Sequence, residues 1–335
     1  MAKTVHIEPS GHTFSVDAGE SILDAALRHG FTLPYGCRNG ACGSCKGKVV
    51  EGEVDYGDKE PAALTEEEQL AGMALFCIGV PEGDLTIEVK EIDAPDQIPM
   101  KTVSARLARM ERVADDVMQL WLELGEGERL QYLAGQYVDI VLPDGRKRAF
   151  SLANPPHADA YLELHVRRIA GGAFTEKLFE EMEAGQSFQI EGPKGYFYLN
   201  EHSEKPVVLM ATGTGFAPVK AIVEHAIAEG LNRPFHVYWG ARTEADLYLD
   251  EVARAWAAEN ENIHYTPVLS APGADWQGRT GYVQDAVMAD FSDLTGYEVY
   301  AAGLPAMVYA ARDSLAAKGL DRECYYSDAF EWAKD

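Results

Sequence analysis

The segment Pro34–Cys45, with the sequence PYGCRNGACGSC, holds three cysteines within nine residues and separates them with glycines. Cys37, Cys42 and Cys45 follow the spacing C-x4-C-x2-C, and Cys77 comes after a longer gap. Because glycine accepts positive φ angles without steric cost, the backbone between these thiols can curl around a small inorganic group. The segment therefore predicts a loop whose cysteines are ligands of a metal centre.

The order of the four cysteines favours a 2Fe–2S cluster. A close triplet followed by a distant fourth thiolate is the plant-type spacing for such a cluster, and it predicts Cys37, Cys42, Cys45 and Cys77 as the ligands. Amide N–H groups of the loop can donate hydrogen bonds to the cluster sulfurs and so adjust its reduction potential. Zinc is the alternative, although structural zinc usually takes its ligands in two close pairs.

Length and composition predict an ordinary globular protein. A chain of 335 residues with 47% hydrophobic residues suits two or three domains. No apolar run approaches the roughly 18–20 residues that span a bilayer, and the start, MAKTVHIEPS, lacks the apolar stretch of a signal peptide. With four of the five cysteines assigned to iron, we expect no disulfide framework and a cytoplasmic location.

The charge of the chain bears on its partners. A net charge of −25 argues against nucleic acid, whose phosphates require a basic surface. Residues 1–95 hold seventeen Asp and Glu against seven Lys and Arg. This acidic excess can steer the first domain towards a basic patch on a redox partner, but solubility explains it as well, so charge alone does not decide between them.

The pattern of elements predicts an α+β multidomain chain with three parts. Residues 1–92 resemble a β-grasp, and residues 93–101 contain two prolines and no periodicity, which is typical of a linker. Residues 102–200 predict a small antiparallel barrel with one helix at Ala173–Glu181. Residues 201–335 alternate strands and helices, which indicates a parallel sheet covered by helices on both faces.

The expected elements are as follows. The first part contains a hairpin, a helix and two further strands, at Thr4–Glu8, Thr13–Val16, Ser21–His29, Lys46–Val50 and Leu85–Val89, with a capping box from Thr65 to Glu68. The barrel strands are Val117–Leu124, Tyr137–Leu142, Lys147–Leu152, Tyr161–Arg167 and Ser187–Ile190. The last part has strands at 206–211, Phe235–Trp239, Ile263–Leu269 and Val299–Ala301, and helices at Ala217–Ala228, Leu249–Ala258, Val283–Ala289 and Pro305–Ala317.

Two segments carry residues suited to binding phosphates and rings. In RAFSLAN, Arg148 can pair with a diphosphate, Phe150 can cover a flat ring, and Ser151 can hydrogen-bond the edge of that ring. Further along, Gly171 and Gly172 precede a helix, where backbone amides can bind an anion. A plain turn into the helix is the alternative for these two glycines.

The second segment is GTGFAP, from Gly213 to Pro218, which follows a strand and opens a helix. Gly213, Thr214 and Gly215 permit close backbone approach to a phosphate or a nicotinamide, and Pro218 suits the first helical turn. The spacing differs from GxGxxG, which disfavours a common Rossmann dehydrogenase.

Taken together, these motifs resemble the ferredoxin-NADP reductase superfamily fused to an N-terminal plant-type ferredoxin, and the resemblance covers the whole chain. RAFSLAN is similar to the superfamily's RxYSxxN flavin motif, with Phe150 in place of tyrosine. The segments LHVRR, EGPKG, YWGAR, PVLS, GRTGY and SDAF resemble the CDP-6-deoxy-glucoseen reductase group and the reductase components of bacterial oxygenases.

The resemblance implies a set of FAD and nicotinamide contacts. Ser151 and Phe330 are the implied catalytic residues, with Ser151 near the flavin N5 and Arg148 on the pyrophosphate. The implied cofactor-binding residues are Arg148, Phe150, Ser151, Asn154, His165, Val166, Arg167, Gly171, Gly172, Thr175, Gly213, Thr214, Gly215, Pro218, Arg242, Asp246 and Gly303.

One position departs from the superfamily. Ala302-Gly303 stands where a cysteine–glycine pair is usual, and we expect the alanine to slow hydride transfer without abolishing it, because FAD performs the chemistry. Cys324 is no obvious replacement and is expected to be a small core residue. Carboxylates such as Asp246 favour NADH, since they repel a 2′-phosphate, whereas Arg242 favours NADPH. We expect NADH.

The implied activity is a reductase with three cofactors in series. NADH gives a hydride to FAD, FAD passes single electrons to the 2Fe–2S cluster, and an acceptor protein takes them one at a time. The acceptor would be a deoxysugar dehydrase, a dioxygenase or a monooxygenase component, and the reductase itself is expected to be a monomer. A redox-sensing module without a dedicated acceptor enzyme is the alternative.

Overall fold

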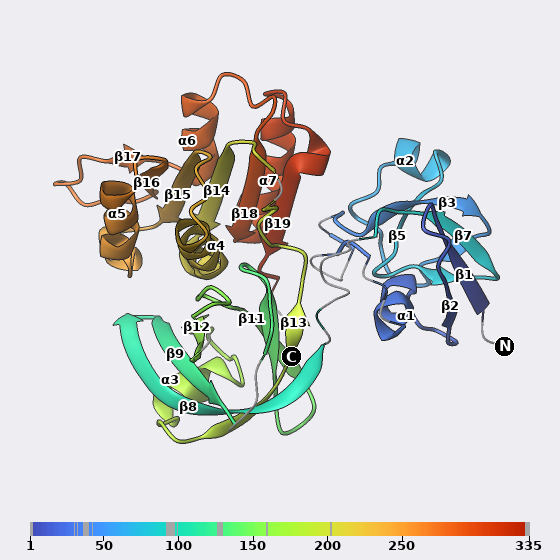
Figure 1. Cartoon of the computed structure of the whole chain (residues 1–335), viewed down its shortest axis with the longest axis horizontal. Coiled ribbons are helices and arrows are strands. Elements are labelled where there is room, and N and C mark those ends of the chain that lie inside the picture. The colour runs from blue at the N-terminus through green and yellow to red at the C-terminus, as the bar shows by residue number, and fades with distance from the viewer. Residues whose placement is uncertain are drawn as a thin grey trace. The chain divides into compact units, whose positions relative to one another are not determined.

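The computed structural model describes residues 3–29, 31, 33–35, 40–41, 43–91, 98, 100–125, 130–158, 160–201 and 203–331. The chain divides into two compact units, Met1–Pro99 and Met100–Asp335 (Figure 1). Within the described residues, no helix is long and apolar enough to cross a membrane.

The first unit is a five-stranded mixed sheet with two short helices, as in a β-grasp. Its strand order is β2–β1–β7–β3–β5, with β1 parallel to β7 and the other neighbours antiparallel. Val5 and Ile7 alternate with more exposed residues along β1 and are fully buried, as are Ile22 and Leu23 of α1, so the core lies between sheet and helix (Figure 1). The strands of this sheet are β1 (Lys3–Glu8), β2 (Thr13–Val16), β3 (Lys46–Glu51), β5 (Met73–Leu75) and β7 (Leu85–Glu88).

Among the smaller elements of this unit, the two helices match the expectations, whereas β4 and β6 were not expected. A two-stranded sheet pairs β4 (Val54–Asp55) with β6 (Val80–Pro81). The helices are α1 (Ile22–Arg28) and α2 (Glu66–Leu70). The expected capping box is confirmed, because Thr65 Oγ1 accepts the Glu68 N–H and Glu68 Oε2 accepts the Thr65 N–H.

The second unit begins with a six-stranded antiparallel sheet that curls into a barrel. The strand order is β11–β10–β13–β8–β9–β12, and a bridge between Leu152 and Leu164 joins the two end strands. Leu107, Leu120 and Ile190 are among the fully buried residues of its core. The elements are β8 (Lys101–Ala114), β9 (Val117–Leu124), β10 (Tyr137–Val141), β11 (Lys147–Ser151), β12 (Leu162–Arg167), α3 (Thr175–Glu180) and β13 (Ser187–Lys194).

A six-stranded parallel sheet, in the order β17–β16–β15–β14–β18–β19, completes the second unit. Along β14, Val207 and Leu209 belong to the core cluster that includes residues of α4 and α5, whereas Val208 and Met210 belong to the one that includes residues of α6 and α7. Strand residues alternate between faces, so this split shows that helices cover both sides of the sheet (Figure 1).

Apart from β17 and β19, where no strand was expected, the strands and α-helices of this part lie close to the expected ranges. The strands are β14 (Val207–Thr212), β15 (Phe235–Ala241), β16 (Ile263–Leu269), β17 (Arg279–Thr280), β18 (Glu298–Gly303) and β19 (Tyr325–Ala329). The helices are α4 (Phe216–Ala228), α5 (Asp250–Glu259), α6 (Val283–Asp290) and α7 (Pro305–Ala316), with the short 3-10 turns η2 (Gly213–Gly215), η3 (Glu244–Asp246) and η4 (Arg322–Cys324).

Candidate functional site

The first unit brings two of the four predicted cluster ligands together. The Sγ atoms of Cys45 and Cys77 lie 3.0 Å apart, and both side chains are buried. Strand pairing produces this approach, because Cys45 immediately precedes β3, Cys77 follows β5, and Lys46 pairs with Leu75. Cys37 and Cys42 lie outside the described residues.

The geometry around these thiols fits a shared metal centre. A separation of 3.0 Å exceeds the roughly 2.05 Å of a disulfide bond, so the two sulfurs approach without bonding, as neighbouring ligands of one centre do. Gly40 and Gly43 adopt φ angles of 83° and 77°, as expected for a loop that curls around such a centre. A Cβ on Gly40 would lie 2.6 Å from Cδ1 of Ile78, so a larger residue there would strain the backbone and displace the Ile78 side chain.

In the second unit, the predicted nicotinamide contacts gather at the carboxyl edge of the parallel sheet. The chain runs from β14 outward to β17 on one side and returns through β18 and β19 on the other, so the strand order reverses beside β14. Ligands of open α/β sheets bind at such a switch point. The predicted residues at or just beyond strand ends on this edge are Gly213, Thr214, Gly215, Pro218, Arg242, Asp246, Gly303 and Phe330.

Glycine at two of these positions is required by close packing. A Cβ on Gly215 would lie 2.2 Å from the carbonyl oxygen of Ala302, and a Cβ on Gly303 would lie 2.4 Å from Thr212 Oγ1. Gly303 also has a φ angle of 122°, which other residues rarely adopt. The glycine turn after β14 and the Ala302-Gly303 pair therefore touch each other, and Phe330 joins them by donating its N–H to the Gly303 carbonyl over 2.8 Å.

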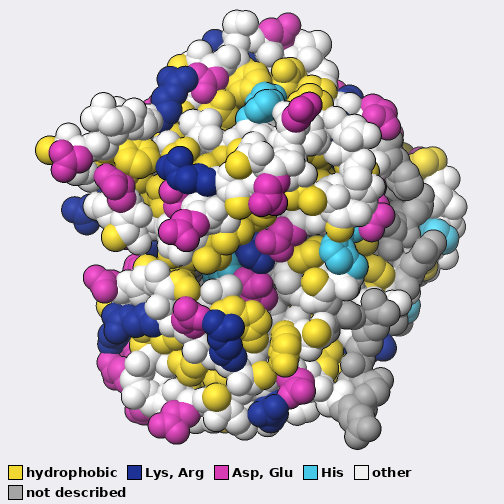
Figure 2. Space-filling view, turned by 60° about the vertical axis from the view of Figure 1, so that its left-hand side comes forward, with side chains coloured by type: hydrophobic (Ala, Val, Ile, Leu, Met, Phe, Trp, Pro, Cys, Tyr) yellow, Lys and Arg dark blue, Asp and Glu magenta, His cyan; other side chains and the backbone are white. Residues whose placement is uncertain are grey.

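The barrel strand that carries RAFSLAN meets this same edge. Ser151 Oγ donates to Asp328 Oδ2 over 3.3 Å, and Asp328 pairs in register with Ala302 across β18 and β19. A Cβ on Gly213 would lie 2.9 Å from Arg167 Nη1. Figure 2 shows the outline of the second unit notched between the part that holds the parallel sheet and the barrel below it.

The other residues of the flavin motif have distinct surroundings. Arg148 is partly exposed, and its Nη1 donates to the Lys147 carbonyl over 3.1 Å. Phe150 lies 5.5 Å from Phe174 between ring centroids. Asn154 is buried and braces its own loop, since Nδ2 donates to the carbonyls of Ala158 and Tyr161.

Around α3, the predicted anion site is partly occupied by the protein itself. The Gly171 N–H donates to Glu176 Oε1 over 2.9 Å. A Cβ on Gly172 would lie 2.6 Å from Thr175 Oγ1, and that hydroxyl accepts the Ile169 N–H over 3.1 Å. The pyrophosphate role of these residues remains a prediction.

Three family models match successive parts of the chain. Residues 5–82 match the 2Fe-2S iron-sulfur cluster binding domain, residues 104–198 the oxidoreductase FAD-binding domain, and residues 209–313 the oxidoreductase NAD-binding domain. The chain is also 40% identical over 330 residues to the CDP-6-deoxy-L-threo-D-glycero-4-hexulose-3-dehydrase reductase of Yersinia pseudotuberculosis, covering 98% of this chain and 99% of that protein. The chain belongs to the iron–sulfur flavoprotein reductases.

Two further relatives extend this family. The reductase component of phenol 2-monooxygenase from Pseudomonas sp. is 35% identical and is matched over 100% of this chain and 96% of its own length. The crystal structure of an Amycolatopsis cytochrome P450 reductase is similar with a TM-score of 0.80 and 33% identity, over 98% of both chains. As a member of the family, this chain is an oxidoreductase with a 2Fe–2S domain, an FAD domain and a nicotinamide domain.

A buried polar network joins the reductase's barrel to its parallel-sheet part. His165, whose side chain is fully buried, places Nε2 2.8 Å from Glu163 Oε1 and Nδ1 3.0 Å from the Tyr248 hydroxyl. A carboxylate only accepts, so Nε2 carries the proton and Nδ1 accepts from Tyr248. Gln119 Nε2 donates to the same Glu163 oxygen over 2.7 Å.

Lys220 supplies the positive charge of the network. Its Nζ lies 3.1 Å from Glu163 Oε2, 3.0 Å from Glu224 Oε2 and 3.2 Å from the Ala153 carbonyl oxygen. Burial by itself raises the pKa of Glu163, but the hydrogen bond from His165 and the charge of Lys220 outweigh it and hold that pKa at about 2, below the ordinary 4.5. Burial lowers the pKa of His165, which keeps the imidazole neutral.

The side chains of the remaining predicted residues differ in how far they already contact other parts of the protein. The side chain of Val166 lies in the barrel core, so only its backbone is available to a cofactor. The Asp246 carboxylate closes a capping box with Thr243, and Arg242 is exposed. Cys324 lies in a core cluster, which confirms its expected structural role.

Sequence reasoning missed several residues of this site. Asp328 lies within SDAF, a segment that contributed only to the family resemblance. Lys220 did carry a signal, because it is the lysine in the otherwise apolar first half of α4, FAPVKAIV. Glu163 stands between two core leucines of β12, where a polar residue faces away from the barrel core and needs a partner of its own.

Proposed function

We propose that the second unit brings FAD and the nicotinamide together where Ser151 contacts Asp328. The observation that carries this proposal is the 3.3 Å hydrogen bond between the two side chains, because it holds the end of the flavin-motif strand at the switch-point edge, beside Ala302 and Gly303. Bound FAD accepts a hydride and releases electrons singly, which a 2Fe–2S cluster needs because it cannot take a hydride itself.

The chain's own residues would then divide the work of binding. Arg148 and Arg167 offer guanidinium groups to the FAD diphosphate. Arg167 suits this role because its Nη1 lies beside the glycine turn at Gly213, while its Nε pairs with Asp116 Oδ2 over 3.2 Å. Phe150 covers the flavin ring from the strand side, and Phe330 lies beside Gly303, where the nicotinamide is expected.

We also propose that NADH is preferred over NADPH. Arg242 immediately follows β15, where an adenosine ribose is expected, and the Asp246 carboxylate lies one turn further on. The carboxylate disfavours a 2′-phosphate by like-charge repulsion. Arg242 opposes this preference, so the discrimination is expected to be moderate.

The acceptor is proposed to be a partner enzyme. The relatives are named as reductases of a hexulose dehydrase and of a phenol monooxygenase, which supports either a dehydrase or an oxygenase component as the acceptor here. We further propose that the reductase is a cytoplasmic monomer, because a chain with four of its five cysteines assigned to iron suits a reducing compartment.

Replacing Cys77 with serine tests the order of electron transfer. The variant should lose the cluster, keep FAD, lose NADH-dependent reduction of cytochrome c and retain reduction of ferricyanide, which can take electrons from the flavin directly. Cys324→Ser is the matched control, because Cys324 lies in a core cluster of the second unit, and it should keep both activities.

Equal loss of both activities in Cys77→Ser would contradict the proposed order. Wild-type protein that reduces ferricyanide but no one-electron protein acceptor would instead favour a redox sensor.

A further inference from the structure

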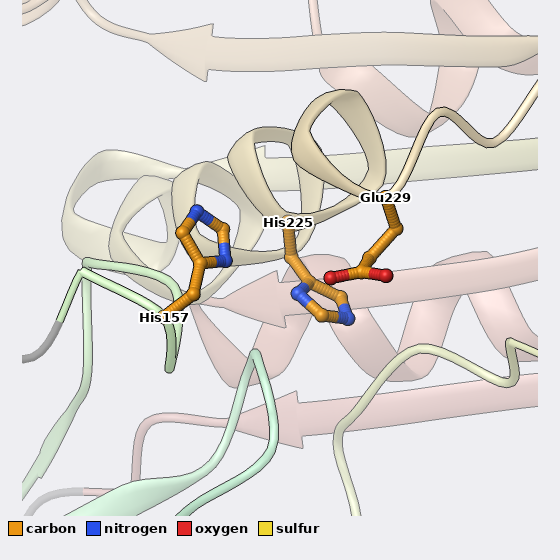
Figure 3. Close-up of side chains that lie close together, drawn as sticks. All are labelled: His157, His225 and Glu229. Carbon is orange, nitrogen blue, oxygen red and sulfur yellow. The ribbon is translucent and has the colours of Figure 1, made fainter.

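Two histidines and a glutamate form a cluster outside the cofactor site. His157, His225 and Glu229 each offer a ligand atom within 4.8 Å of the others (Figure 3). His157 lies in the loop between β11 and β12, whereas His225 is in the last turn of α4 and Glu229 directly follows that helix. His225 is nine residues beyond the start of α4, about 14 Å along the helix from the glycine turn.

His225 is oriented as a metal ligand would be. Its Nε2 lies 2.8 Å from Glu201 Oε1, and because a carboxylate only accepts, Nε2 carries the proton. In the neutral imidazole, Nδ1 then keeps a lone pair. His225 is only 7% exposed, and its Nδ1 is buried with no hydrogen-bond partner among the described residues.

An unpaired buried acceptor needs an explanation, because nearly all buried polar atoms in proteins have a partner. A metal ion would supply one. In metal sites, a histidine commonly donates its second ring N–H to a carboxylate, which fixes the tautomer and raises the basicity of the ligating nitrogen. Glu201 occupies that position here.

The local backbone presents the other two ligands. The Glu229 N–H donates to the His225 carbonyl over 3.0 Å, so the two side chains are spaced i, i+4 and share one face of the helix. The loop that holds His157 is braced by Asn154, whose Nδ2 donates to the Ala158 carbonyl over 2.9 Å. Figure 3 shows the His157 ring facing His225, with the Glu229 carboxylate beside the latter.

We propose that His157, His225 and Glu229 bind a divalent transition-metal ion, for which zinc is the best match. Two imidazoles and one carboxylate form a common zinc ligand set with a fourth position left for water, whereas calcium and magnesium prefer oxygen ligands throughout. Tetrahedral zinc with bonds of about 2.1 Å places its ligands about 3.4 Å apart. His157 and Glu229 are exposed and can rotate to close the remaining gap.

The ion would fasten the barrel to the parallel-sheet part, because His157 comes from a barrel loop and the other two ligands from α4 and the residue that follows it. This role is independent of the proposed electron-transfer function and of the cysteine ligands.

Equilibrium dialysis of the full-length, FAD- and iron-loaded protein against zinc chloride tests the site. Metal analysis should find one zinc per chain in the wild type with iron content unchanged, and zinc should raise the Tm. His157→Gln and Glu229→Gln replace exposed residues, and each should weaken zinc binding at least tenfold and remove the Tm increase. His264→Gln, which replaces an exposed histidine of β16, is the matched control and should bind like the wild type.

Three results would overturn the site. The first is wild-type protein that binds less than one zinc per chain at a millimolar zinc concentration. Equal zinc affinity in the wild type, His157→Gln and Glu229→Gln would place the ion elsewhere. Zinc uptake that rises only as iron is lost would assign it to the cysteines.

Discussion

Replacing Lys220 with methionine removes a cation that contacts both Glu163 and Glu224. Methionine keeps an unbranched side chain of similar length, so packing changes little while the charge is lost. Glu163 is only 7% exposed, and its carboxylate would remain buried without its ionic partner, which lies 3.1 Å away in the wild type. Removing one partner of a buried ion pair typically costs about 3–5 kcal/mol.

The pKa of Glu163 gives an independent estimate. A fall from 4.5 to about 2 corresponds to about 3 kcal/mol at 1.36 kcal/mol per pH unit. Lys220 supplies only part of this, because the hydrogen bond from His165 lowers the pKa of Glu163 more than the charge of Lys220 does. For a unit of this size, a loss of 3–5 kcal/mol lowers the Tm by roughly 6–20 °C.

The pH dependence follows from the direction of the shift. A carboxyl whose folded pKa is depressed contributes stability that is fully present above its unfolded pKa and is lost as the pH falls through the folded value. Protonation of Glu163 removes the charge that Lys220 stabilises. The difference in Tm between wild type and Lys220→Met should therefore be largest near pH 7. It should shrink first as Glu224 protonates, because burial raises the pKa of that carboxyl above 4.5, and then as the pH falls from 4.5 towards 2 and Glu163 protonates.

Thermal unfolding of the FAD-loaded protein, followed by calorimetry, measures this difference. Lys177→Met replaces an exposed lysine of α3 and should change the free energy of unfolding by less than about 0.5 kcal/mol. Adding Glu163→Gln to Lys220→Met should recover part of the loss, because the buried charge is then gone. The prediction is wrong if Lys220→Met is as stable as Lys177→Met. It is also wrong if the losses of unfolding free energy from Glu163→Gln and Lys220→Met simply add in the double variant.

Three further predictions concern the cofactors and the acceptor. Arg148→Ala should weaken FAD binding by about 1.5–3 kcal/mol in a fluorescence titration, while Arg146→Ala, whose guanidinium pairs with Asp144, should not. Ser151→Ala and Asp328→Ala should each slow flavin reduction by NADH in stopped-flow experiments. The double variant should lose less transition-state stabilisation than the sum of the two single losses, and strictly additive losses would show that the two residues act independently. The rate of electron delivery to the true acceptor should fall with added salt more than the rate of flavin reduction does, since the Debye length is about 8 Å at physiological ionic strength. If both rates depend equally on salt, the acidic residues within 1–95 do not steer the acceptor and serve only as a solvated surface.

Most elements of the fold could be predicted because their signals are local. The helices α4 to α7 and the strand β16 lie within one or two residues of their expected ranges, since apolar periodicity and terminal glycine or proline act over a few neighbouring residues. The four-cysteine spacing and the glycine turn after β14 are equally local.

Elements whose pairing decides their structure were missed. The outer half of β8, with the sequence ARMERVA, contains several exposed charged residues and pairs along its length with β9. No local sequence pattern predicts this pairing. β19 has little alternation and becomes a strand because β18 offers it a parallel edge. Backbone hydrogen bonds to a distant strand supply the stability that the sequence of such a segment does not encode alone.

The cysteine spacing, the two predicted cofactor motifs and the order of the three parts can be recognised in the sequence, because each depends on residue types at short spacing. Which distant residues meet is visible only in the folded structure. It placed Asp328 against Ser151, Lys220 against Glu163, and His225 beside His157. In each pair the partners come from different elements, often more than fifty residues apart, and they meet only after the barrel and the parallel sheet have packed together. The energy of each contact depends on burial, which no single segment of the chain possesses on its own.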